Sequence, residues 1–409
     1  MCIKRCFLFF LGLVLFWLCG VSGALGANTL DTRKRSEPSR NPILFDCMKG
    51  DQEPHVLGWC ASGRSLTLVH LTGYSRTERW TFSLAQAAFI KTETPYFYGG
   101  VQLSLFNATR YFLGLLQVAA VFEDSSRFVG GLRVGLMNRL DEHFTGLAQL
   151  GLVNGVEDRF TGLLQFGGMN EFRRFFGLLQ FGLLNEHADD WNDGRLFWKG
   201  QKFVGLAQIA VISNEMDSGF ALMQLAGIRN RANVFAGLLQ LAVTNRTGAF
   251  YGALQLSLLN RGRYYGGLAQ LGILNWTRSV LTLLQVGFHN EARHFVGAAQ
   301  IGVTNQPTDF IGLAQVGVWN QARTFVGMQL GVANFTSDAL AGVQAGLSSF
   351  VWGDFFGVQL GVLNFAKVMS GVQIGFINFA RKGKGLQIGV LNIMFNGVLP
   401  ILPVLNWSW

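Results

Sequence analysis

The sequence predicts an all-β fold in which about 22 tandem repeats of about 15 residues form one continuous sheet. Gln recurs at near-constant intervals over most of the 409-residue chain. Each repeat is rich in glycine, β-branched and aromatic residues, which excludes a helix. Its apolar positions alternate with small or amide-bearing ones, as the two faces of a strand require. With 50% hydrophobic and 14% charged residues, the composition excludes a disordered chain.

Residues 1–27 have the pattern of a secretory signal peptide. Lys4 and Arg5 form a short basic start, residues 7–19 are an apolar run, and residues 20–27 are small. We therefore expect the chain to be exported, with an uncleaved anchor as the alternative. After this leader no apolar run is long enough for a membrane helix.

Residues 28–64 form an N-terminal segment that precedes the repeats. Cys47 and Cys60 are the only cysteines beyond the leader. In an exported chain such a pair favours a single disulfide. Two free thiols are the alternative.

Residues 65–409 form the repeat domain, interrupted by a polar insertion that we expect to be a loop at 186–202. Glutamines at equivalent positions of neighbouring strands can bond to one another along the sheet, because an amide both donates and accepts. The asparagines that close the repeats suit the junction between a strand and a turn. We assign structural roles to Gln149, Gln165, Gln240, Gln255, Gln270, Gln285, Gln300, Gln315, Asn245, Asn260, Asn275 and Asn290. Rows of these amides that grip a polar ligand are the alternative.

Two architectures fit the repeat. The favoured one is an antiparallel outer-membrane β-barrel with tight turns, because a strand of about ten residues spans a bilayer and an unbroken apolar face suits lipid. The alternative is a parallel β-solenoid, in which identical residues stack coil on coil. A solenoid with a packed interior better explains the leucines two residues before the marker, such as Leu268 and Leu313. The shortness of nearly every connection also argues against a barrel.

The chain ends in Trp407-Ser408-Trp409. This end resembles the aromatic terminus that bacterial outer-membrane barrels present for assembly. Trp407 and Trp409 are therefore predicted to form an assembly signal.

No pattern of catalytic chemistry emerges from the sequence. The six histidines lack metal-ligand spacing, no pair of carboxylates suits a hydrolase, and no phosphate-binding glycine loop precedes a helix. We expect no enzymatic activity, no cofactor and no metal. The basic residues are scattered singly, which predicts no nucleic-acid partner.

The segments at residues 371–378 (GVQIGFIN) and 385–392 (GLQIGVLN) resemble the GLQxGxxN repeats of the surface repeat-containing protein family of leptospires and other bacteria. The resemblance covers about four fifths of the chain. It implies an exported, envelope-associated repeat protein without assigned enzymatic activity, and it supplies no functional residues. The departures are Arg133 in place of Gln, Ser349 in place of Asn, and the wider Gln-to-Asn spacing after Gln208 and Gln224.

The functional hypothesis is therefore a non-enzymatic envelope protein of the bacterial outer membrane or cell surface. As a barrel it would act as a pore or surface structure, with membrane lipid as its partner. As a solenoid it would be a secreted or surface binding module or adhesin for a host or envelope macromolecule.

Overall fold

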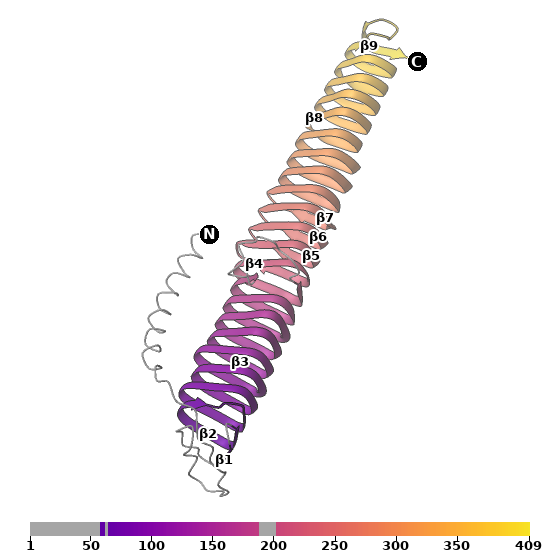
Figure 1. Ribbon diagram of the computed structural model, residues 1–409. Coiled ribbons are helices and arrows are strands. Elements are labelled where there is room, and N and C mark those ends of the chain that lie inside the picture. The colour runs from indigo at the N-terminus through magenta and orange to yellow at the C-terminus, as the bar shows by residue number, and fades with distance from the viewer. Residues whose placement is uncertain (1–57, 62–63, 188–201) are drawn as a thin grey trace, which may run out of the picture. The chain divides into compact units, whose positions relative to one another are not determined.

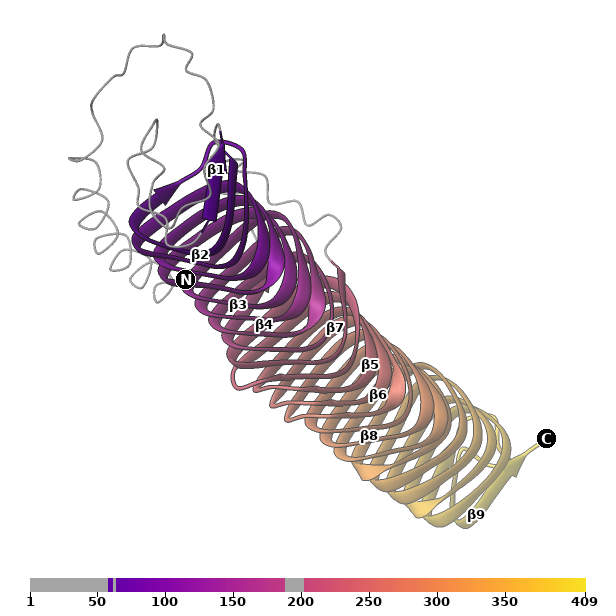
Figure 2. The same cartoon turned by 90° about the horizontal axis from the view of Figure 1, so that it is seen from below.

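The computed structural model describes residues 58–61, 64–187 and 202–409, which form a parallel β-solenoid (Figures 1 and 2). Its coils follow one another in chain order, and the longest strands run through several coils without a break. The strands are β1 (Gly58–Ala61), β2 (Arg64–Arg76), β3 (Trp80–His187), β4 (Lys202–Ala226), β5 (Arg229–Leu241), β6 (Thr244–Leu256), β7 (Leu259–Leu271), β8 (Leu274–Met394) and β9 (Ile401–Ser408).

The predicted antiparallel barrel is wrong, because consecutive repeats pair in parallel. Between β5 and β6 the glutamines face each other, and so do the asparagines and the phenylalanines: Gln240 with Gln255, Asn230 with Asn245, Phe235 with Phe250. An antiparallel pair would bring identical residues together at only one point of the strand. Parallel stacking aligns every position at once. The tight turns expected between strands are also wrong, since β8 continues through residues 274–394 as one strand. The predicted function as a pore depended on the barrel and is therefore wrong as well.

A typical coil divides into three segments of five, which we call its sides. In the coil of residues 295–309, Phe295, Gln300 and Asn305 begin the first, second and third side, and all three are buried. The third residue of each side is Gly297, Gly302 or Pro307. A Cβ added at Gly297 or Gly302 would meet interior atoms such as the Phe295 ring and the Asn305 amide, so these positions also face inward. The remaining residues form the outer surface.

The coils near the C-terminus shorten the first side to four residues, and a glycine makes this possible. In residues 355–358 the third position is Gly357, with φ of 137°. L-residues rarely adopt this conformation. A Cβ at Gly357 would also lie 1.9 Å from the Gly342 oxygen of the coil before. First sides of four and of five residues therefore stack on each other with their glutamines still paired, as Gln329 with Gln315.

Both described ends of the solenoid carry an antiparallel strand. β1 pairs with β2, and β9 pairs with the last coil of β8. The reversal covers the backbone edge on which another parallel coil could be added. Val404, in β9, is the one described non-glycine residue with positive φ, at 65°.

The insertion does not interrupt the stack. Glu186 and His187 end β3 and Lys202 begins β4, so these three residues belong to strands and not to the predicted loop. Residues 188–201 lie outside the described part. Gln180 and Gln208, on either side of the insertion, face each other in register. The leader and Cys47 also lie outside the described residues. The expected disulfide between Cys47 and Cys60 therefore lies outside them as well. Within the described residues no helix has the length and apolar character needed to cross a membrane.

Candidate binding surface

The glutamines form a ladder inside the solenoid. Gln300 Nε2 donates to Gln285 Oε1 at 2.8 Å, and Gln315 Nε2 donates to Gln300 Oε1 at 3.0 Å. The same bond joins Gln165 to Gln149 and links Gln240, Gln255, Gln270 and Gln285 in turn. All of these side chains are buried. Because each amide donates to the preceding coil and accepts from the next, the ladder satisfies groups that would otherwise be costly to bury.

The asparagines form a second interior ladder, and so do not lie in turns. Asn245, Asn260, Asn275 and Asn290 are buried, and each Nδ2 donates to the Oδ1 of the asparagine in the next coil. The second Nδ2 hydrogen completes a bond to a backbone oxygen, as from Asn290 to Ile301 at 2.8 Å. Neither amide row reaches the surface. The alternative that these residues grip a polar ligand therefore has no support in their position.

Phenylalanines form a third interior row at the start of the first side. Phe295 and Phe310 stack with their ring centroids 4.9 Å apart, and Phe310 and Phe325 follow at 4.7 Å. In a typical coil Phe, Gln and Asn are thus five residues apart, as Phe295, Gln300 and Asn305 are. This spacing is present in the sequence and indicates three sides, whereas the two-residue alternation of a flat strand does not.

One pair of charged residues interrupts both amide ladders. Arg133 stands in the glutamine row and Glu123 in the asparagine row of the preceding coil, and both are fully buried. Arg133 Nε lies 3.7 Å from Glu123 Oε2, and its Nη2 donates to the backbone oxygens of Glu123 and Arg139. Burial raises the pKa of Glu123 to about 7, although the neighbouring Arg133 opposes the shift. The sequence shows Arg133 as a departure from the glutamine marker. It was not predicted that Glu123 takes the asparagine position one coil after Asn107.

The outer surface of the first and second sides is apolar and exposed. On the first side Leu283 is 61% exposed and Leu313 is 69% exposed; on the second side Phe288 is 60% exposed. The leucines two residues before many of the glutamines were expected to pack inside a solenoid, and this expectation is wrong, because they lie on the outer surface. The interior thus combines amide ladders with a phenylalanine row, while the first and second sides also expose many large apolar side chains.

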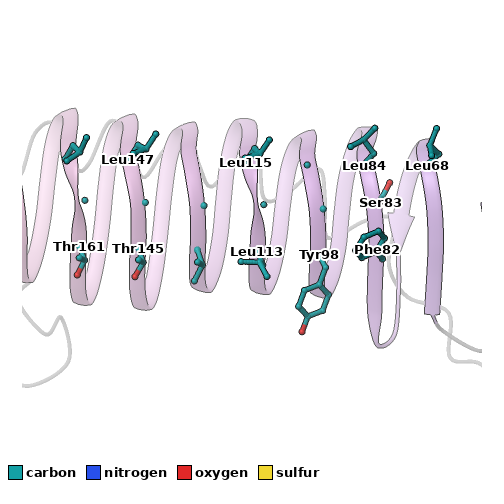
Figure 3. Close-up of a pocket in the computed structure, with 18 of the residues that line it drawn as sticks. Leu68, Phe82, Ser83, Leu84, Tyr98, Leu113, Leu115, Thr145, Leu147 and Thr161 are labelled. Atoms are coloured by element: carbon teal, nitrogen blue, oxygen red, sulfur yellow. The ribbon is translucent and has the colours of Figure 1, made fainter.

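The first side is hollowed into a groove over the coils from Leu68 to Phe176, with a volume of about 1240 Å³. Its floor is a row of glycines, including Gly114, Gly130, Gly146 and Gly162. Figure 3 shows Leu68, Leu84, Leu115 and Leu147 along one edge and Phe82, Tyr98, Leu113, Thr145 and Thr161 along the other. The lining contains no charged side chain.

The third side carries most of the charge of the outer surface. Arg127 pairs with Glu142, and Arg139 Nη2 lies 3.0 Å from Glu157 Oε1 in the next coil. Further along, Asp309 pairs with His294 at 2.8 Å and accepts from Thr324 Oγ1 at 2.6 Å. These partners come from neighbouring coils, so they join the coils along the polar side.

The remaining predicted residues do not form a chemical site in the described structure. Trp407 lies in β9 opposite Leu386, and Trp409 follows the strand; with the barrel wrong, nothing in the fold supports their role as an assembly signal. Among the described residues no three His, Cys, Asp or Glu side chains gather as a metal site. Comparison with models of known families, with curated proteins and with solved structures finds no match. The candidate site is therefore the apolar outer surface of the first and second sides.

Proposed function

We propose that the chain is an exported, non-enzymatic surface protein whose β-solenoid is a binding module for lipid. The observation that carries this proposal is the exposure of hydrocarbon along two of the three sides. Contiguous apolar patches beyond a few hundred Å² are rare on soluble monomers and mark sites of interaction. Here such rows extend from Leu68 to Val390. The resemblance to surface repeat proteins agrees with a place at the cell surface.

A lipid partner suits the backbone as well as the side chains. An apolar layer supplies no hydrogen bonds, so every backbone group that it covers needs a partner within the protein. In a solenoid the coils before and after supply these partners, as the continuous ladders between β4 and β8 show. The first and second sides can therefore contact hydrocarbon without unpaired backbone groups, while the charged third side stays at the water boundary.

Flotation with phosphatidylcholine vesicles tests the proposal. The full chain, purified in detergent, is mixed with lipid, the detergent is removed, and the vesicles are floated on a density gradient. We expect the chain to float with the vesicles. A variant with Leu268→Asn, Leu283→Asn and Leu313→Asn on the first side should float much less, because each change removes exposed hydrocarbon.

The matched control replaces Glu291, Gln306 and Thr308 by Asn on the outer third side. This control should float as the parent chain does. Chains that associate with one another and stay at the bottom of the gradient while the vesicles float would contradict the proposal. Equal flotation of the first-side variant and the control would contradict it as well.

A further inference from the structure

One stretch of the chain that contains arginines but no acidic residue places four of its arginines on the third side. Between Asp217 and Glu291 the sequence has six arginines and no acidic residue. The structure brings four of them together in consecutive coils, which we call the arginine patch: Arg246, Arg261, Arg263 and Arg278. Arg246 faces Arg261 in the register of β6 and β7. Arg263 lies opposite Arg278 in the register of β7 and β8, because the residues on either side pair as Gly262 with Thr277 and Tyr264 with Ser279. Arg261 and Arg263 are two residues apart in the sequence, and the stacking of coils brings Arg246 and Arg278 beside them.

Within the coils that the structure describes, the patch has no acidic partner. All four arginines are exposed, and none has a carboxylate within 4.0 Å among the described residues. Arg127, Arg139 and Arg323 on the same side elsewhere each pair with an acidic residue. Like charges that face each other across neighbouring strands destabilise a sheet. The four exposed guanidinium groups can therefore bind an anionic partner.

We propose that the arginine patch binds the phosphate groups of anionic lipid headgroups. This inference rests on the proposed lipid-binding function, and it adds which lipids the solenoid prefers. The planar guanidinium group binds phosphate in a bidentate manner. Coils about 4.8 Å apart present the arginines as a row, so that several headgroups can be bound side by side.

The surroundings of the patch favour lipid over a soluble polyanion. The patch lies on the third side, whose neighbours along the coil are the apolar second side, with Leu258 and Ile273, and the apolar first side, with Leu268. Exposed Trp276 faces Arg261, and exposed Tyr264 follows Arg263. Arg, Trp and Tyr beside hydrocarbon are the composition of a protein surface at the membrane boundary. An acidic polysaccharide or a nucleic acid would match the charge but leave the adjoining hydrocarbon uncovered.

Vesicles of two compositions test this inference on the full chain. One set is phosphatidylcholine alone, and the other contains about one third phosphatidylglycerol, whose negative surface attracts basic residues. We expect tighter binding to the anionic set, with a preference that shrinks as salt is raised. We expect the ratio of affinities for anionic and neutral vesicles to fall about a hundredfold in the variant Arg261→Gln, Arg263→Gln, Arg278→Gln. Each arginine near such a surface contributes about fivefold to the affinity.

The matched control is Arg127→Gln, Arg139→Gln, Arg323→Gln, which removes the same charge from positions that already have acidic partners. This control should keep the preference of the parent chain. Equal losses in both variants, or no preference for anionic vesicles in a chain that binds neutral ones, would overturn the inference alone. A chain that binds neither set would overturn the proposed function itself. Binding of heparin that the patch variant loses, in a chain without any preference for anionic vesicles, would show that the patch has a soluble polyanion as its partner.

Discussion

Glu123 and Arg133 form an ion pair inside the solenoid, with Oε2 of the one 3.7 Å from Nε of the other. Each replaces an amide, Glu123 in the asparagine row and Arg133 in the glutamine row. Because an arginine interrupts the glutamine row, Gln117 Oε1 and Gln149 Nε2 have no hydrogen-bond partner among the described residues. The two departures from the repeat therefore compensate each other in charge, although they interrupt both ladders.

Restoring both amides should make the solenoid at least as stable as the parent chain. Arg133→Gln or Glu123→Asn alone leaves one charge buried without its partner, which typically costs about 3–5 kcal/mol. In the double variant the restored glutamine can bridge Gln117 and Gln149, and the restored asparagine can bridge Asn107 and Asn138. Denaturant unfolding of the four proteins measures the coupling. A double variant whose loss equals the sum of the single losses would show that the pair does not act as a unit.

Stability should rise as the pH falls from about 8 to about 5. Because the pKa of Glu123 is raised to about 7 from an ordinary value of 4.5, the folded chain binds a proton that the unfolded chain releases between these values. The stabilisation is complete below the unfolded pKa and disappears as the pH rises through 7, with a maximum of about 3 kcal/mol. Unfolding curves at both pH values measure it. Glu123→Gln should remove this dependence, and a variant that keeps the full dependence would assign it to other groups.

Exchanging Gln and Leu should destabilise the solenoid in its interior and have little effect on its outer surface. Gln300→Leu leaves Gln285 Oε1 and Gln315 Nε2 unpaired in the interior, where each unpaired group costs about 1–3 kcal/mol. Leu313→Gln, on the exposed first side, should change the free energy of unfolding by less than about 0.5 kcal/mol. Chemical unfolding of both variants and the parent chain, all in one detergent, measures the change in the free energy of unfolding. The interior ladder would lose its assigned role if Gln300→Leu were as stable as the parent chain.

Removal of β9 should cause the solenoids to associate end to end. β9 pairs antiparallel with the last coil of β8, where Gln387 faces Asn406 and Leu386 faces Trp407. Without it, the backbone groups of that coil are free to pair with another chain. Light scattering of a chain that stops at residue 400 should show larger particles than the full chain in the same detergent. A full chain with Trp409→Ala is the control, since Trp409 lies beyond the strand. Truncated chains of unchanged size would mean that β9 does not protect the edge.

The sequence by itself determined the repeat, its β character and the amide markers, because a word repeated at near-constant intervals can be read without knowing how its copies meet. It did not determine the direction of pairing, because a central glutamine faces its equivalent in either arrangement. Only the structure showed that Phe235, Gln240 and Asn230 all face their equivalents, which requires parallel coils. The same stacking brings Glu123 to Arg133 and Arg246 to Arg261. Such neighbours are decided by the length of the coil and not by adjacency along the chain, so the tertiary structure alone could reveal them.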